Sequence, residues 1–349
     1  MYRGYILFSF IKKWLTMRYL RNTCTDPYFN MAFDEYALEQ LPLDEPLFYL
    51  WQNKPAVIIG LNQDAYAEVD INYLRANGIA LVRRVTGGGA VFHDLGNLNY
   101  TIVGRSTDLN RDYPDYARHV LHALQALGVD AELSGRNDIL VCGRKVSGYA
   151  KRVYKDRLMV HGTLMYDVDL TTLEQVLNPP PEKLAIKGVA SVRSRVVNLC
   201  KYLPKVKSID DLRMRLEEHL SRGYRDGEVL LLDEQLQAIE RMAHKKFATE
   251  DWNYRHSVPQ GVDTTPMVRR GRLACGIVEV VLQVSDHSIV ACRFGGDFIG
   301  DLSPVALEKA LVGVSYERKS ILECLAAMDV GRYFDGVQSN ELLPLIVDR

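Results

Sequence analysis

The sequence predicts an α+β fold with two parts, because short strands and helices follow one another without a regular strand–helix alternation. At 349 residues, with 47% hydrophobic and 25% charged residues, the chain can form one large soluble domain and a smaller one. The periodicity is lost between residues 251 and 266, where Pro259, Gly261 and Pro266 fall. We therefore expect a boundary there, with domains at residues 21–255 and 261–349.

The first part begins with a helix. Asp26 and Thr25 are candidate N-caps, Pro27 suits the first turn, and apolar residues recur at helical spacing as far as Leu41. Apolar, β-type runs then predict strands at residues 47–51, 56–59, 80–83, 90–92, 98–103 and 158–166. Further helices are expected at residues 113–127, 209–221 and 233–247, and Gly128 ends the first of these.

Two hairpins are expected. Residues 138–141 and 145–147 flank the turn at Cys142-Gly143-Arg144, and residues 277–284 and 289–294 flank a polar turn at 285–288. Helices at residues 303–313 and 317–328 follow the second hairpin. A hairpin with two helices makes the second part a small α+β domain.

Charge and cysteine content exclude some classes of protein. The formal net charge is −1, so the chain lacks the basic footprint of a nucleic-acid binder. The six cysteines form no Cys-x-x-Cys pair and no zinc-ligand cluster, which predicts reduced thiols in a cytoplasmic protein. They are Cys24, Cys142, Cys200, Cys275, Cys292 and Cys324.

The first 20 residues form an extension with an apolar run at residues 5–10 and positive charges only. The run is too short to cross a membrane, and no small-residue cleavage site follows it. An organellar targeting peptide remains an alternative, although serine is sparse. We favour a true translation start at Met17.

The densest signal lies at residues 83–97, which read Arg-Arg-Val-Thr-Gly-Gly-Gly-Ala-Val-Phe-His-Asp-Leu-Gly-Asn. Three consecutive glycines are entropically costly, so they indicate unusual backbone angles or close approach by a ligand. Free N–H groups beside two arginines suit an anion such as phosphate. The run is neither a P-loop nor a dinucleotide fingerprint, and a simple glycine-rich turn is the alternative.

A second signal comprises Gly-Arg-Asn-Asp at residues 135–138, Gly-Arg-Lys-Val-Ser-Gly-Tyr-Ala at 143–150 and His-Gly-Thr-Leu at 161–164. Lys145 opens a strand whose partner carries Asp138, so it can reach into a cleft and hold a carboxylate or phosphate. Taken singly, Lys145 could be a solvated strand-end lysine and His161 a core histidine.

Together these segments resemble the lipoate–protein ligases, whose boxes occur here in the family's order. The likeness begins at Thr25 and includes residues 177–179, Lys183, residues 187–188, residues 191–196, Asn198 and, in the second part, Gly-Asp-Phe at 296–298. It implies a biotin/lipoate-ligase-like catalytic domain of mixed sheet and helices with a C-terminal accessory domain.

The resemblance also implies a reaction and its site. ATP, with Mg²⁺, would activate lipoate (or octanoate) as an acyl-adenylate, releasing pyrophosphate. ATP and lipoyl-AMP binding is implied for Arg84, Gly87, Gly88, Gly89, Ala90, Val91, Phe92, Asn97, Asn137, Asp138 and Lys145. Lipoate binding is implied for Lys145, Ser147, Gly148, His161 and Thr163. Lys145 would be the catalytic residue, bridging carboxylate and α-phosphate, and Asp138 would hold Mg²⁺ with a phosphate.

The implied acceptors are lipoyl domains of 2-oxoacid dehydrogenase subunits or the glycine-cleavage H protein, bound by a monomeric ligase. We expect the small domain to move between adenylation and transfer through the segment at residues 251–266. Neither nucleic acid nor a membrane is an expected partner.

Three alternatives remain. Octanoyltransferases share the fold and use a cysteine nucleophile. Here residues 176–181 carry no thiol and Cys142 sits at a hairpin tip. Short acyltransferases also generally lack a second domain. A lipoyltransferase that uses preformed lipoyl-AMP would keep that domain. A non-catalytic lipoate carrier would need the ATP step to be lost, whereas Arg84 and Lys145 are intact. Biotin ligases are disfavoured because their glycine–arginine signature is absent.

Overall fold

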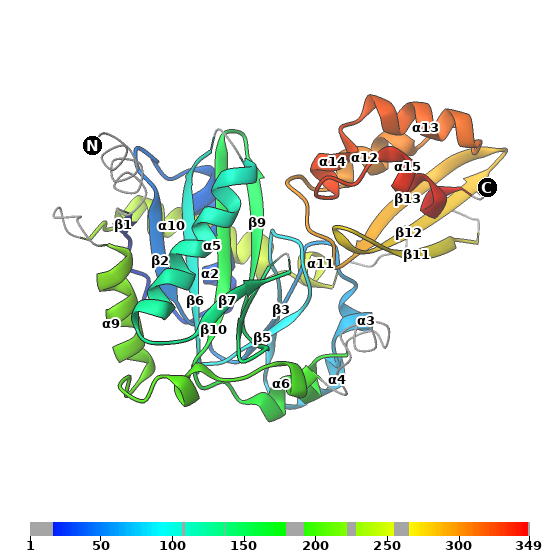
Figure 1. The fold of residues 1–349 in the computed structure, drawn as a ribbon. Helices are drawn as coiled ribbons and strands as arrows, with labels where there is room; N and C mark the ends of the chain where they lie inside the picture. Colours follow the sequence, from blue (N-terminus) through cyan, green and yellow to red (C-terminus); the bar gives the residue numbers. More distant parts are fainter. Residues whose placement is uncertain are drawn as a thin grey trace, which may run out of the picture.

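The computed structural model describes residues 17–106, 109–135, 137–178, 192–221, 228–254 and 265–347. Figure 1 shows a larger body of sheets and helices beside a smaller body built from the C-terminal residues. The mixture of sheets and helices confirms the predicted α+β class. In the described part of the chain, no helix is long and apolar enough to cross a membrane.

Seven strands form the main sheet, in the spatial order β1-β2-β6-β10-β9-β8-β7. β1 runs parallel to β2, and the other neighbouring strands are antiparallel. The strands are β1 (Arg18–Tyr19), β2 (Leu47–Trp51), β6 (Asn97–Arg105), β7 (Ala131–Ser134), β8 (Asp138–Val141), β9 (Arg144–Tyr154) and β10 (Arg157–Met165).

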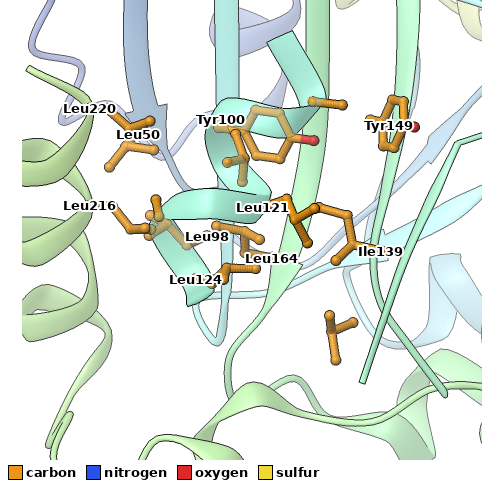
Figure 2. Packing of buried hydrophobic residues seen from close by; sticks show 14 of the residues in the cluster. Leu50, Leu98, Tyr100, Leu121, Leu124, Ile139, Tyr149, Leu164, Leu216 and Leu220 are labelled. Carbon is orange, nitrogen blue, oxygen red and sulfur yellow. The ribbon is translucent and has the colours of Figure 1, made fainter. Parts of the chain in front are cut away.

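Helices cover both faces of this sheet. Phe48 and Leu50 of β2 pack into the core beneath α5 (Leu109–Ala126) and α9 (Ile209–Leu220), part of which is drawn in Figure 2. Tyr49 and Trp51 point the other way, into the core beneath α2 (Pro27–Glu39) and α10 (Asp233–Met242). Burial on both faces explains why β2 is a continuous apolar run rather than an alternating one.

Helix α2 starts where the sequence predicts. The Asp26 carboxylate accepts hydrogen bonds from the backbone N–H groups of Tyr28 and Phe29 at 2.7 and 3.1 Å, and Pro27 occupies the first turn. The helix places Asp34, only 1% exposed, beneath the middle of the sheet. Two further elements, a π-helical turn (Ala243–Phe247) and α11 (Glu250–Asn253), follow α10.

A second, three-stranded sheet holds the glycine-rich loop. Its order is β4-β3-β5, with β3 (Ala56–Ile59), β4 (Ala80–Arg83) and β5 (Val91–His93). The loop joins β4 to β5, and short helices α3 (Ala65–Glu68) and α4 (Ile71–Ala76) connect β3 to β4. Later short elements are α6 (Leu170–Val176), α8 (Val192–Arg195) and a 3₁₀ helix (Leu199–Tyr202).

The smaller body is an antiparallel sheet of β11 (Met267–Leu273), β12 (Gly276–Ser285) and β13 (Ser288–Gly296). Its helices gather on one side of the sheet in Figure 1. They are α12 (Val305–Leu311), α13 (Arg318–Ala327), α14 (Val330–Tyr333) and α15 (Ser339–Ile346). The predicted hairpin and two helices are present, and β11, α14 and α15 are additions.

Several polar contacts between described residues join the two bodies. Lys151 of β9 lies between two carboxylates of the smaller body, with Nζ 3.0 Å from Asp301 Oδ1 and 2.8 Å from Asp335 Oδ1. The Gly88 N–H donates to the Phe298 carbonyl at 3.3 Å, and the Gly296 N–H donates to the Asn62 carbonyl at 3.0 Å. The glycine-rich loop is thus in direct contact with the smaller body.

Some expectations concern residues outside the described ranges. These are residues 1–16 of the expected extension, Arg136, residues 179–181, Lys183, residues 187–188, Ser191 and most of the expected boundary segment, residues 255–264. Of the remaining extension, Met17 and Leu20 are buried, and β1 pairs with β2. Residues 17–20 are therefore packed as part of the larger body.

Candidate active site

A cavity of about 170 Å³ lies where the main sheet, the glycine-rich loop and the smaller body meet. Its apolar lining includes Met31, Trp51, Ile58 and Val91. Its charged lining comprises four cations and two carboxylates: Arg84, Lys145, Arg195, Arg272, Asp138 and Asp297. A cavity with an apolar lining and a surplus of positive charge suits an amphipathic anion.

Lys145 and Asp138 meet across the β8–β9 hairpin, as the sequence predicts. Cys142 and Gly143 form the turn with φ angles of 49° and 71°, and the register shifts between Ile139 and Leu140. Lys145 Nζ lies 2.7 Å from Asp138 Oδ1, and Arg195 Nη2 lies 2.7 Å from Oδ2. One carboxylate is therefore paired with two cations.

Two glycines make room for this arrangement. A Cβ at residue 148 would overlap the Lys145 ammonium and lie 2.7 Å from its Cε. A Cβ at residue 162 would lie 2.5 Å from the Tyr100 hydroxyl and 2.8 Å from the Gly148 carbonyl oxygen. Glycine at these positions is needed for close approach of neighbouring atoms rather than for unusual backbone angles.

Arg84 holds the glycine-rich loop from within. Its Nη2 donates to the carbonyls of Gly87 at 2.7 Å and Gly89 at 2.9 Å, and its Nη1 donates to the Ile58 carbonyl at 3.1 Å. Gly88 between them has φ +94°. Burial lowers the pKa of the guanidinium to about 10, so it stays charged at neutral pH. Its donors are directed at the backbone, although it also lines the cavity.

A buried chain of hydrogen bonds connects Arg84 to helix α2. Arg84 Nε donates to Thr86 Oγ1 at 2.9 Å, and Thr86 Oγ1 lies 2.8 Å from His161 Nε2. His161 Nδ1 lies 2.6 Å from Asp34 Oδ2. Asp34 Oδ1 also accepts from the hydroxyls of Tyr49 and Thr101 at 2.6 and 2.9 Å. The four-residue chain fixes the loop against the main sheet.

His93 lines the cavity as a neutral imidazole. Burial, with the nearby charge of Arg84 second, lowers the pKa of this histidine to about 3. The Asn53 amide lies 3.1 Å from Nδ1. Among the described residues, Nε2 of His93 and Nδ2 of Asn99 are buried without a hydrogen-bond partner, and both residues line the cavity. A polar ligand group could satisfy them.

Most of the residues that the sequence singled out gather around this cavity. The lining includes Arg84, Gly88, Gly89, Ala90, Val91, Asn137, Asp138, Lys145, Gly148, His161 and Thr163. Four others do not line it: Gly87 faces the smaller body, Phe92 packs in an apolar core, and Asn97 and Ser147 are buried in the sheet. Strand alternation explains Phe92 and Ser147, which point away from their cavity-lining neighbours.

The structure adds residues that the sequence did not single out. Trp51 and Asn99 come from β2 and β6, Met31 from α2 and Arg272 from β11. Four more lie inside segments already noted in the sequence: His93, Gly162, Arg195 and Asp297. Because these four lie in segments already singled out, the sequence could have identified them as site residues. No sequence pattern pointed to the other four residues: Trp51, Asn99, Met31 and Arg272.

The expected Mg²⁺ position at Asp138 does not fit the side chains found there. Both carboxylate oxygens are already paired with cations, Lys145 and Arg195. In the described residues no group of three or more His, Cys, Asp or Glu side chains could hold a metal ion. The described side chains alone therefore form no divalent-cation cage, and Mg²⁺ that enters with ATP would be held largely by its phosphates and by water.

The chain matches known protein families along most of its length. Residues 26–221 match the family described as "Lipoyl protein ligase A/B catalytic domain", and residues 266–346 match "Bacterial lipoate protein ligase C-terminus". The lipoate-protein ligase LplJ of Bacillus subtilis is 35% identical over 92% of this chain and 97% of its own length.

Two solved structures are similar to more than two thirds of the chain. An archaeal bi-partite lipoate protein ligase from Thermoplasma acidophilum, described with its E2 lipoyl domain, has a TM-score of 0.60 and 31% identity, covering 71% of this chain and 99% of that one. A lipoate-protein ligase A bound with ATP has a TM-score of 0.60 and 29% identity, covering 68% and 98%. The chain belongs to the lipoate–protein ligase family.

Proposed function

We propose that the protein activates lipoate with ATP and transfers the lipoyl group to a lysine of an acceptor protein, both at the cavity described above. One juxtaposition supports this function most directly: the Lys145–Asp138–Arg195 cluster and the glycine-rich loop share a cavity with an apolar lining. The acyl chain would contact the apolar side chains, and the carboxylate and phosphates would meet the cations.

The comparisons support both substrates. The Bacillus subtilis relative is named a lipoate-protein ligase, and a 29% identical ligase has been solved with ATP. Octanoate differs from lipoate by the dithiolane ring, so it remains a second acyl substrate in this proposal.

In the first half-reaction, a lipoate carboxylate oxygen attacks the α-phosphorus of ATP. A new P–O bond forms, the bond to the α,β-bridging oxygen breaks, and pyrophosphate leaves with that electron pair. Lys145 exchanges its contact with Asp138 for one with the carboxylate and α-phosphate, while Arg195 keeps Asp138 paired. This second cation avoids the cost of an unpaired, largely buried carboxylate.

The glycine-rich loop supplies a wall that the phosphates can approach closely, because residues 87–89 have no side chains. Arg84 and the chain through Thr86, His161 and Asp34 set the shape of that wall before ligand arrives. Positioning and charge neutralisation then supply most of the rate.

In the second half-reaction, the neutral amine of the acceptor lysine attacks the acyl carbon of the mixed anhydride. The C–N bond forms, the C–O bond to phosphate breaks, AMP leaves with the electron pair, and the amine loses a proton. No enzyme nucleophile is required, and no described cysteine lines the cavity. Lipoyl domains are the favoured acceptors, because the archaeal neighbour is described with its E2 lipoyl domain; the glycine-cleavage H protein is the second candidate.

The test is lipoate-dependent exchange of pyrophosphate into ATP, measured for the wild type and for Lys145→Ala. We expect exchange in the wild type and its loss in the variant. Lys155→Ala is the matched control, because Lys155 is exposed beyond the far end of the same strand. Absence of exchange in the wild type, with transfer from synthetic lipoyl-adenylate intact, would identify a lipoyltransferase instead.

A further inference from the structure

Arg272 reaches the cavity from the smaller body. It lies on β11 opposite Ile277 of β12, and both residues line the cavity. Exposed and less exposed residues alternate along β11, with Arg272 on the same exposed face as Val268 and Arg270. On the other face, Gly271 approaches Leu345 of α15 so closely that a Cβ would lie 2.6 Å from its Cδ2. Arg272 therefore projects away from the apolar core of the smaller body.

The other three cations of the cavity already have partners. Lys145 and Arg195 share Asp138, and Arg84 donates to Thr86 and to carbonyls of the loop. Within the described ranges, the Arg272 side chain makes no hydrogen bond and no ion pair, and it is exposed. The N–H groups of its guanidinium are therefore available to a ligand, and their planar arrangement matches the oxygens of a phosphate.

The glycine-rich loop places this arginine on the phosphate side of the cavity. The loop's Gly88 N–H donates to Phe298, the last residue of the Gly-Asp-Phe segment at 296–298. Asp297 of that segment lines the cavity with Arg272 and accepts a hydrogen bond from the Ile277 N–H at 2.8 Å. The strand end that carries Arg272 is therefore fixed beside the loop that the phosphates approach.

We propose that Arg272 binds the β- and γ-phosphates of ATP and stabilises the departing pyrophosphate, an inference that rests on the function proposed above. As the bond from the α-phosphorus to the bridging oxygen breaks, negative charge grows on the leaving group, and the guanidinium neutralises it. The smaller body thereby completes the site for adenylation. Transfer from the adenylate involves no pyrophosphate, so Arg272 has no part in it.

The experiment compares Arg272→Gln and Arg272→Lys with Arg270→Gln in the full-length protein. Arg270 is the matched control because it lies on the same face of β11, two residues away, and does not line the cavity. Two reactions are measured for each protein: lipoate-dependent ATP–pyrophosphate exchange, with kcat/KM for ATP and for pyrophosphate, and transfer of lipoyl from synthetic lipoyl-adenylate to a lipoyl domain. Thermal midpoints report folding.

We expect Arg272→Gln to lower kcat/KM for ATP and for pyrophosphate in exchange about 10-fold or more, the effect of losing one charged hydrogen-bonded contact. Arg272→Lys should fall between, since it keeps the charge without the planar fork. Transfer from lipoyl-adenylate and all reactions of Arg270→Gln should be unchanged.

Two results overturn this role. Unchanged exchange in Arg272→Gln shows that Arg272 does not meet the triphosphate. Equal losses in exchange and transfer assign it to binding of the lipoyl-adenylate, which both reactions share, or to folding. Wild-type protein without exchange refutes the ATP-using function itself, and the role of Arg272 with it.

Discussion

Lys145 reaches Asp138 over the backbone of Gly148. Its Nζ lies 2.7 Å from Asp138 Oδ1, and its Cε would lie 2.7 Å from a Cβ at residue 148. Asp138 and Gly148 are direct partners in the β8–β9 pairing. The Lys145 side chain therefore extends along its own strand to Gly148 and contacts the Asp138 carboxylate there. The position of Lys145 therefore depends on the absence of a side chain at residue 148 as well as on the negative charge of Asp138.

Gly148→Ala should displace the Lys145 ammonium by about 1 Å, the shift that brings it into ordinary contact with the added Cβ. A misplacement of that size at a reacting centre costs on the order of 100-fold in rate, so we expect exchange activity to fall by that order. The matched control is Gly295→Ala, where an added Cβ would meet its nearest atom at an ordinary 3.5 Å. Equal activity of the two variants would show that Lys145 does not need its present position.

Asp34→Asn should disrupt the chain that holds the glycine-rich loop. The carboxylate accepts from Tyr49, Thr101 and His161, and an amide nitrogen in place of either oxygen would face a donor. Loss of buried hydrogen bonds to a carboxylate costs about 2 kcal/mol of unfolding free energy, measurable by urea denaturation. Asp156→Asn is the control: its ion pair with Arg105 is exposed, so the change should be below about 1 kcal/mol. A similar small change at Asp34 would contradict the prediction.

Lys151→Met should loosen the contact between the two bodies. Removal of the ammonium leaves Asp301 and Asp335, both within 3.0 Å of it now, as neighbouring like charges. We expect slower ATP–pyrophosphate exchange, unchanged transfer from synthetic lipoyl-adenylate and a larger radius of gyration in X-ray scattering. Lys155→Met, in the turn after the same strand, is the control. A radius of gyration identical to that of the wild type would argue against Lys151 as an interdomain contact.

His93 should make the protein sensitive to mild acid. Its pKa is lowered from 6.5 to about 3 in the folded state, so below pH 6.5 the unfolded chain binds more protons and the free energy of unfolding falls as pH decreases. Between pH 7 and 5.5 the loss from this one group is about 1 kcal/mol. His93→Gln should show a correspondingly smaller loss over the same interval in chemical denaturation. An equal pH dependence in both proteins would mean that His93 takes up its proton without unfolding.

Local signals made much of the fold predictable from the sequence. Asp26 caps α2 because its carboxylate reaches two free N–H groups, which a sequence pattern reveals directly. The β12–β13 hairpin was visible because its strands are apolar on both sides of a polar turn. β11 was not predicted, since Arg269, Arg270 and Arg272 interrupt any apolar pattern and the strand is held by pairing with β12. Such pairing is a tertiary effect.

The site was predictable where its residues lie in ordered boxes. Lys145, Asp138 and His161 were singled out that way and do meet at the cavity. Arg272 and Trp51 were not, because strands far apart in sequence carry them to it. The sequence also did not predict the direction of a side chain. An arginine after a buried strand suggests an anion ligand, yet Arg84 donates its hydrogen bonds to the Gly87 and Gly89 carbonyls.

The glycine-rich loop belongs to the ligand cavity and to the contact between the two bodies at once. A Cβ at Gly87 would overlap the Phe298 carbonyl oxygen and lie 3.2 Å from Ile299 Cα, while Gly88 and Gly89 line the cavity. Any ligand that reshapes the loop must therefore change how strongly the two bodies associate. By thermodynamic reciprocity, separating them must change the affinity for that ligand by the same factor. One coupling free energy therefore links nucleotide binding to the association of the two bodies. It can be measured by titrating either the nucleotide or the contact between the bodies.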